Sequence, residues 1–309
     1  MSNSSYTVPD GTVKIKDRAF SGQLDLTQVD LPESVEQIGS CAFSECGALQ
    51  TAHLPNHLKS LGPLAFKDCT KLQSVNIPSG LKEIRGWTFE QCRELRSLEL
   101  PDGIETIDTG AFINCKGLTS LRLPRNLKTI GEHAFEECTG LTELYIPEGV
   151  TAIRRGAFWD CCSLRKITLP TTLRHKGNDL FTGCRGLTDI LLTRPTNQNA
   201  ERMFLDTSKF EDKVFLAAGL LNERISSNML KDYIARYVMQ ILHLLADQYN
   251  DAMFLKVLSF PFVQDTVKAN FDDLFDEVNR KNNMKIKAIL LEYRDRHLGY
   301  FHADDEFEL

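Results

Sequence analysis

One feature constrains the fold of this chain more than any other: a pattern that recurs every 23 residues without insertion or deletion. Sequence self-similarity at a period of about 20 to 50 residues is typical of solenoids, in which one unit is stacked many times. Phenylalanine, proline and cysteine each mark the period. The phenylalanines are Phe20, Phe43, Phe66, Phe89, Phe112, Phe135, Phe158 and Phe181. The prolines are Pro9, Pro32, Pro55, Pro78, Pro101, Pro124, Pro147 and Pro170. The cysteines are Cys46, Cys69, Cys92, Cys115, Cys138, Cys161 and Cys184.

Residues 118–124, LTSLRLP, show how one repeat folds. Leucines alternate with Ser120 and Arg122, and this alternation predicts a short strand with one buried face. Pro124 ends the strand, since proline cannot donate to a ladder. Each coil buries about seven apolar side chains at about 1.5–3 kcal/mol each, but one coil cannot close a core alone. We therefore expect a β-rich leucine-rich-repeat solenoid of about eight coils.

The pattern L-P-x-x-[VL]-x-x-I-x-x-x-A-F-x-x-C-x-x-L-x-x-[VL]-x-[LI]-P, over residues 9 to about 193, resembles the BspA-like, or Treponema-type, leucine-rich repeat family. The resemblance implies that the L-x-x-L-x-L segments form a concave parallel sheet and the A-F-x-x-C segments the convex side. It also implies bacterial or protozoan surface or secreted proteins, some of which bind host matrix proteins.

The seven cysteines of the repeat are expected to form a file along the stack, about 5 Å apart. A file of one ligand per coil does not converge on a tetrahedral zinc site, and seven is an odd number for disulfide pairing. We interpret each cysteine as a small inward-facing side chain whose S–H bonds to a turn carbonyl. Cys41 and Cys162 lie outside the file, and Cys162 is predicted to be the most reactive thiol. No metal and no cofactor is expected.

The period ends before a second, helical unit. We expect the solenoid to span residues 1–193, a linker or docking loop 194–207, and a helical domain 208–309 that covers the open end of the stack. Ser208 and Glu211 form a capping-box pattern at the start of the first helix. Apolar spacing predicts five helices in antiparallel pairs, resembling an ankyrin-like bundle, over residues 208–221, 226–248, 251–260, 263–279 and 284–298. The acidic tail, residues 302–309, is expected to be frayed.

Composition and motifs argue against several classes of function. A net charge of −6 without a basic run disfavours nucleic acid as a partner, and no apolar stretch is long enough to span a membrane. The sequence contains no nucleophile elbow, phosphate-binding loop or dinucleotide fingerprint. His53 and His57 are four residues apart but lie across a strand and its proline turn, so they do not predict a metal site. An enzyme within the helical unit is kept only as an alternative.

The outward strand positions are the most promising surface. One row of the predicted sheet is chemically varied, and tyrosine and arginine within it are favoured interface residues. The candidate partner-binding residues of this face are Asp30, His53, Asn76, Glu99, Arg122, Tyr145 and Lys166. The alternative is that these solvent-exposed positions have no binding role and are free to vary.

The sequence thus favours a non-catalytic, monomeric module that binds a protein partner of unknown identity on the concave face. The alternative that the family resemblance implies is a secreted or surface adhesin for matrix proteins or glycans. The N-terminal segment MSNSSYTVPDG does not resemble a signal peptide. The chain also has nine cysteines whose spacing suggests no disulfide pairs, which fits a reducing compartment. A cytoplasmic location is therefore favoured over the cell surface.

Overall fold

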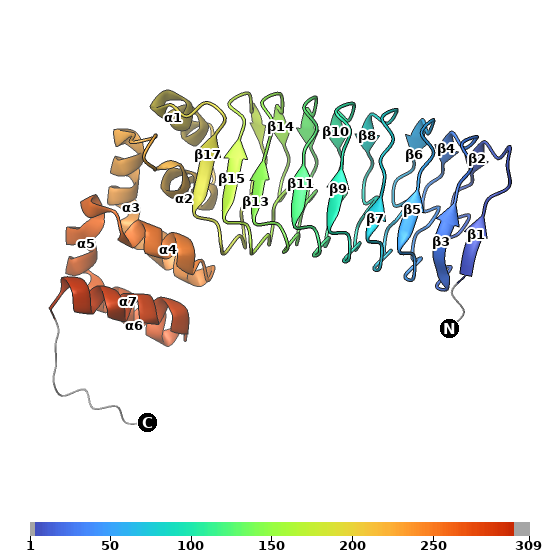
Figure 1. The fold of residues 1–309 in the computed structure, drawn as a ribbon. Coiled ribbons are helices and arrows are strands. Elements are labelled where there is room, and N and C mark those ends of the chain that lie inside the picture. Colours follow the sequence, from blue (N-terminus) through green and yellow to red (C-terminus); the bar gives the residue numbers. More distant parts are fainter. Residues whose placement is uncertain (1–3, 300–309) are drawn as a thin grey trace, which may run out of the picture.

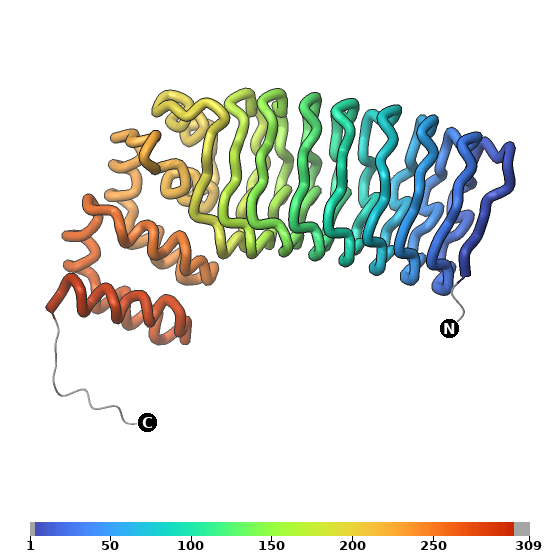
Figure 2. The backbone as a smooth tube through the Cα atoms, in the orientation of Figure 1, coloured from blue at the N-terminus to red at the C-terminus, as the bar shows by residue number. Residues whose placement is uncertain are grey.

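The computed structural model describes residues 4–299, which form a parallel β-solenoid followed by a helical unit. The first described residues lie at one end of the stack and the helices cover the other (Figure 1). The path of the chain is a regular succession of flattened coils up to the last strand (Figure 2). This arrangement confirms the predicted solenoid of about eight coils with helices at its C-terminal end.

Two rows of strands run along the solenoid, and we call them the odd-strand face and the even-strand face. The odd-strand face contains β1 (Ser4–Thr7), β3 (Leu26–Asp30), β5 (Thr51–His53), β7 (Ser74–Val75), β9 (Ser97–Glu99), β11 (Ser120–Arg122), β13 (Glu143–Tyr145), β15 (Lys166–Leu169) and β17 (Asp189–Leu192). The even-strand face contains β2 (Lys14–Ile15), β4 (Gln37–Ile38), β6 (Ser60–Leu61), β8 (Glu83–Ile84), β10 (Thr106–Ile107), β12 (Thr129–Ile130), β14 (Ala152–Ile153) and β16 (His175–Lys176).

All strand pairs are parallel, and from β3 onward each residue pairs with the one a full repeat later, as Glu99 does with Arg122. The hydrogen-bonded ladder of the odd-strand face is not continuous. It is divided into β1-β3-β5-β7, β9-β11 and β13-β15-β17. The even-strand face is divided once, between β6 and β8. The strict period of the sequence does not predict these interruptions.

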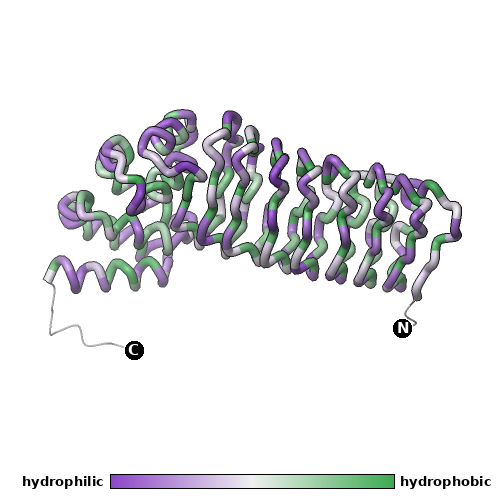
Figure 3. Tube along the Cα trace, turned by 45° about the horizontal axis from the view of Figure 1, so that its top comes forward, coloured by the Kyte–Doolittle hydropathy of each residue, from purple (hydrophilic) through white to green (hydrophobic). Residues whose placement is uncertain are grey.

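The core of the solenoid is organised around the repeated phenylalanines. From Phe20 to Phe181 the rings stack in one column, with consecutive centroids 5.1–6.1 Å apart and ring planes within 10° of parallel. Hydrophobic and hydrophilic segments alternate along every coil (Figure 3), because one side of each strand faces this column and the other faces solvent. Tyr6 contacts the first ring edge-on, at a centroid distance of 5.1 Å.

Two turn positions in every coil adopt the left-handed backbone conformation. At the first position, which Trp87 and Gly110 occupy in successive coils, φ lies between 53° and 62°. At the second position, occupied for example by Asn114 and Gly183, φ lies between 54° and 75°. This conformation costs a non-glycine residue about 1–2 kcal/mol. Hydrogen bonds between coils offset the cost: the backbone N–H of Trp87 donates to the carbonyl of Thr109 at 2.9 Å, and that of Asn114 donates to Glu136 at 2.8 Å.

The helical unit contains α1 (Asn197–Leu205), α2 (Phe210–Leu220), α3 (Asn228–Asp247), α4 (Asp251–Leu258), the 3₁₀ turn η1 (Pro261–Val263), α5 (Gln264–Ala269), α6 (Phe271–Arg280) and α7 (Met284–His297). The helical character of this unit is confirmed, whereas the predicted number of five helices is wrong. Resemblance to an ankyrin-like bundle stays a prediction. The acidic tail at 302–309 lies outside the described residues.

Three local predictions for this unit need correction. The segment 194–207, predicted as a linker or docking loop, contains α1, whose N-cap Thr196 accepts a hydrogen bond from Asn199 N at 3.1 Å. The capping box at Ser208 does not form, since α2 begins after Lys209 without a side-chain cap. The helix predicted at 263–279 is divided at Asn270, whose Nδ2 donates to the carbonyl of Thr266 at 2.8 Å. Side-chain bonds of this kind compete with helical backbone bonds.

The junction between the two units is a packed extension of the solenoid core. The phenylalanine column continues into α2, where Phe215 lies 6.4 Å from Phe181 between ring centroids. Gly219 permits the close approach of α2 to β17, because a Cβ atom at this position would lie 2.7 Å from Ile190 Cγ1. Buried Asn250 Nδ2 donates to the carbonyl of Cys184 at 3.0 Å. The helices therefore cover the apolar end of the stack, as predicted.

Candidate binding surface

The odd-strand face is interrupted between β7 and β9, at the coil that contains Asn76. In neighbouring coils the residue at this position belongs to a strand, but β7 ends at Val75. Asn76 instead uses its side-chain amide, which accepts from Leu54 N and donates to Leu54 O, both at 2.7 Å. These two bonds face the preceding coil, where the ladder between β5 and β7 is limited to two residue pairs. On its other side, β7 does not pair with β9.

A hollow of about 590 Å³ lies over this interruption. Its floor is apolar, with Val75, Ile77 and Leu100 each at most 8% exposed. Its walls carry polar and charged side chains, among them His53 and Glu99. An apolar floor with a few polar groups around it is the usual composition of a pocket that accepts one or two side chains of a partner.

Charged groups at one edge of the hollow hold each other in place. Arg122 Nη2 lies 3.4 Å from Asp102 Oδ1, and Arg125 Nε lies 3.7 Å from Asp102 Oδ2. The backbone N–H of Arg125 also donates to Asp102 at 3.0 Å. Arg122 is well exposed, so its pairing with Asp102 contributes little stability and leaves guanidinium donors free for a partner.

Four of the seven predicted binding residues line this hollow: His53, Asn76, Glu99 and Arg122. Asp30 lies beside them, because it pairs with His53 in the ladder. Tyr145 and Lys166 lie further along the same face, beyond the second interruption between β11 and β13. Tyr145 is 58% exposed, whereas Lys166 is half-buried and its Nζ bonds to Glu143 at 3.1 Å.

Sequence reasoning missed the contribution of Asp102 and of the apolar floor. Asp102 follows the proline of its coil, a position not considered as part of the surface. A signal for the early end of β7 was nevertheless present: asparagine is unfavourable within strands, and Asn76 occupies a strand position of the repeat. The pairing of that side chain with Leu54 depends on the distance between coils, which the sequence does not specify.

The seven cysteines of the repeat lie inside the solenoid, at most 1% exposed. Each Sγ lies 3.0–3.2 Å from the carbonyl oxygen of the phenylalanine 26 residues earlier. Burial raises the pKa of every one of these thiols, to about 11 for Cys46 and to about 12 for Cys161. The thiolate, which is the form that attacks electrophiles and binds metals, is therefore strongly disfavoured. Cys162 is exposed and Cys41 is half-buried.

Within residues 4–299, no three His, Cys, Asp or Glu side chains come close enough together to hold a metal ion. His53 lines the hollow, and His57 lies exposed in the turn after it. None of the helices that the structure describes is both long and apolar enough to cross a bilayer.

A family model described as the BspA type leucine rich repeat region, present in six copies, matches residues 2–119 and 105–230. No curated protein matches the chain. The matches therefore cover the whole solenoid and the first helices that follow it.

Several solved bacterial structures are similar to this chain. A leucine-rich repeat protein from Bacteroides ovatus is 28% identical with a TM-score of 0.51, over 62% of this chain and 55% of that one. A leucine rich cell surface protein from Faecalibacterium prausnitzii is 27% identical with a TM-score of 0.45, over 64% of this chain and 61% of that one. The leucine-rich repeat protein of T. pallidum is 29% identical with a TM-score of 0.44, over 60% of this chain and 78% of that one. The chain thus spans less than two thirds of the first two proteins.

Proposed function

Because this chain belongs to the BspA-type leucine-rich repeat family, we propose that it is a non-catalytic module that binds a protein partner through its odd-strand face. The single observation that supports this proposal best is the hollow between β7 and β9. There the solenoid presents an apolar floor surrounded by His53, Glu99 and Arg122 on a rigid support.

The chemistry of the hollow suits a partner that inserts an apolar side chain and pairs charges around it. Burial of one large side chain on the floor of Val75, Ile77 and Leu100 contributes about 1.5–3 kcal/mol. Glu99 and Arg122 offer one anionic and one cationic contact on adjacent strands, which fixes the orientation of the partner. Exposed Tyr145 extends the same face and supplies a further aromatic contact.

The test is a capture experiment with the purified full chain carrying a photo-crosslinking amino acid at Ser97, in β9 at the hollow. We expect the double variant Glu99→Ala/Arg122→Ala to lose most of the captured partner. The matched control is Glu83→Ala/Arg85→Ala, on the even-strand face, where the same two residue types form an exposed ion pair at 2.7 Å.

The two possible results separate the surfaces. Loss of capture in the first variant and retention in the control supports the odd-strand face. Unchanged capture after Glu99→Ala/Arg122→Ala, or an equal loss in both double variants, contradicts it. Thermal unfolding of each variant must match that of the unmodified protein, as expected for exposed side chains.

A further inference from the structure

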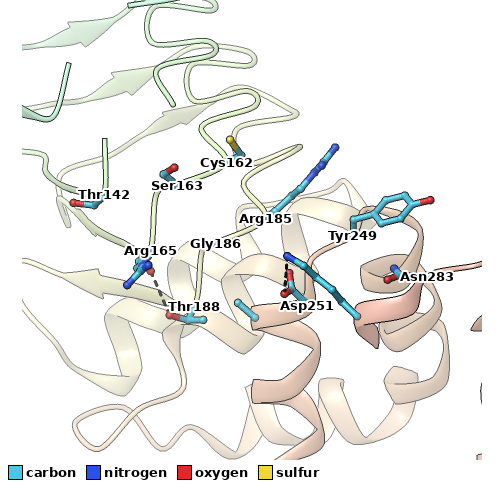
Figure 4. Close-up of a pocket in the computed structure, with 12 residues that line it drawn as sticks. Thr142, Cys162, Ser163, Arg165, Arg185, Gly186, Thr188, Tyr249, Asp251 and Asn283 are labelled. Atoms are coloured by element: carbon cyan, nitrogen blue, oxygen red, sulfur yellow. Dashed lines mark hydrogen bonds and ion pairs between the residues drawn. The ribbon is translucent and has the colours of Figure 1, made fainter. Parts of the chain in front are cut away.

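A second hollow, of about 750 Å³, lies between the last coils of the solenoid and the helical unit. Figure 4 shows Arg165 and Arg185 on the solenoid side, and Tyr249 and Asp251 on the helical side. Cys162 also lines it. Both walls are needed to form it, so this cleft exists only because the helices dock against the end of the stack. The odd-strand hollow is separate from it.

The cleft is basic, although the chain as a whole is acidic. It contains Arg165, Arg185 and Lys285 but only one acidic residue, Asp251, whereas the net charge of the chain is −6. Lys285 Nζ lies 3.8 Å from Asp251 Oδ2. Within the described part of the chain, neither Arg165 nor Arg185 has a carboxylate oxygen within 4.0 Å of its guanidinium group. Two uncompensated guanidinium groups beside one cleft attract an anionic ligand.

Repeat packing does not require these two arginines. Threonine occupies the position of Arg165 in the coils before and after it, at Thr142 and Thr188. Cys162 occupies the position of Arg185 in the preceding coil. Both arginines are exposed, so their charge is not a consequence of the solenoid core.

Tyr249 is the most unusual residue of the cleft. It follows the C-cap of α3 with φ of 54°, a left-handed position at which glycine or asparagine is normally preferred. A tyrosine there carries a conformational cost of about 1–2 kcal/mol. Its ring is half-exposed and the guanidinium group of Arg185 lies 5.7 Å from the ring centroid. This contact holds Arg185 at the mouth of the cleft by a cation–π interaction.

We propose that this cleft binds an acidic peptide segment of a partner protein. Arg165 and Arg185 lie at separate places on the solenoid side of the cleft in Figure 4, so a ligand that engages both must carry several separated negative charges. The volume of the cleft also exceeds what a single small anion fills. An extended run of Asp and Glu residues meets both conditions, and Arg pairs well with carboxylates because its planar donors bind them in bidentate fashion.

The test uses fluorescence anisotropy with a fluorescein-labelled octapeptide of alternating Asp and Glu, and the full chain in low-salt buffer. We expect Arg165→Glu/Arg185→Glu to weaken binding at least tenfold. The matched control is Arg96→Glu/Arg93→Glu, because these arginines occupy the same two repeat positions three and four coils earlier, away from the helices. The control is expected to stay within twofold of the unmodified protein.

A second readout locates the bound peptide. Cys162 is exposed in the cleft, whereas half-buried Cys41 lies near the other end of the solenoid. Saturating peptide is expected to slow alkylation of Cys162 by iodoacetamide at least fivefold and to leave Cys41 unchanged. Protection of both thiols, or of neither, contradicts the proposed location.

Four further results of the binding experiments would overturn the proposal. One is equal binding by the two double variants, and another is no saturable binding of the octapeptide. A third is displacement of the peptide by inorganic phosphate at equal concentration, which would indicate a site for a single anion. The last is binding that appears only after Asp304, Asp305 and Glu306 are changed to amides, which would assign the cleft to the chain's own acidic segment.

Discussion

The solenoid and the helical unit are stabilised in opposite ways. Each coil of the solenoid repeats one set of contacts: a stacked phenylalanine, a buried cysteine bonded to a carbonyl, and two left-handed turns. The helical unit has no such repetition, and its attachment depends on individual contacts such as those of Asn250 and Asp212. A repeated contact distributes stability among neighbours, whereas a unique contact concentrates it at one residue.

This difference can be measured because both tryptophans, Trp87 and Trp159, lie in the solenoid. Tryptophan fluorescence therefore follows the unfolding of the solenoid alone. Far-UV circular dichroism at 222 nm is dominated by the helices. Urea denaturation observed by the two signals separates the stability of one region from that of the other.

The largest effect is expected for Phe112→Ala in the middle of the column. Phe112 is fully buried between rings at 5.5 Å and 5.3 Å, so its removal leaves a cavity that both neighbours line. We expect a loss of about 3–5 kcal/mol in the free energy of unfolding, measured by tryptophan fluorescence in urea. Phe20→Ala, at the half-buried end of the column, is the control and should cost clearly less. Equal losses of stability in the two variants would contradict the view that each ring is stabilised by its neighbours in the column.

A smaller and more local effect is expected for Asn250→Ala. Its Nδ2 donates to the carbonyl of Cys184, and its Oδ1 accepts from Met253 N at 2.9 Å as the N-cap of α4. Loss of both bonds should lower the free energy of unfolding by about 2–3 kcal/mol. The helical signal at 222 nm should be lost at a lower urea concentration than the tryptophan signal.

Asn283→Ala provides the matched control for this contact, because Asn283 caps α7 and bonds to Ala246 without reaching the solenoid. In Asn250→Ala, hydrogen exchange should accelerate in α4 and at the end of the solenoid. In Asn283→Ala it should accelerate only within the helical unit. Identical exchange patterns would show that Asn250 does not connect the two regions.

The pH dependence of the junction should change in Asp212→Asn. Burial raises the pKa of Asp212 from 3.8 to about 6, so the folded state favours its protonated form. The stability that this group contributes is present below pH 4 and is lost as the pH rises through 6. The free energy of unfolding of the variant should therefore be about 1–2 kcal/mol higher than that of the unmodified protein at pH 8. At pH 3.5 the two proteins should differ little in stability. Urea melts followed at 222 nm test this, and a difference that grows toward low pH would contradict it.

The smallest effect is expected for Cys115→Ala. The thiol is fully buried, but only one sulfur atom and its bond to Phe89 are lost, so the cost should be about 1 kcal/mol. In the native protein Ellman's reagent should modify Cys162 rapidly and Cys41 more slowly, and Cys162→Ser should remove the fast phase. Rapid modification of more than two thiols would show that the core is open.

The repeat could be predicted in detail because local sequence decides it. The spacing of Phe112 and Cys115 within one coil is sufficient to place both side chains inside. The helices were predicted less well. Asn270 divides one predicted helix, since its side chain bonds to the carbonyl of Thr266, and α1 forms in a segment whose polar composition indicated a loop. The partner-binding residues stay a prediction, although the structure places four of them around one hollow.

The sequence by itself determined the number of coils, the side that each coil buries and the presence of helices after the last coil. It did so because a constant period gives every coil the same neighbours, and therefore the same contacts. Only the tertiary structure decided where the odd-strand ladder is interrupted and where the basic cleft lies. Both involve residues of different coils or units. In the coil next to the interruption, Asn76 bonds to Leu54 of the preceding coil, and at the cleft Arg185 contacts Tyr249 across the junction. No periodic pattern specifies the distance between such residues, because it results from the packing of whole coils and helices against each other.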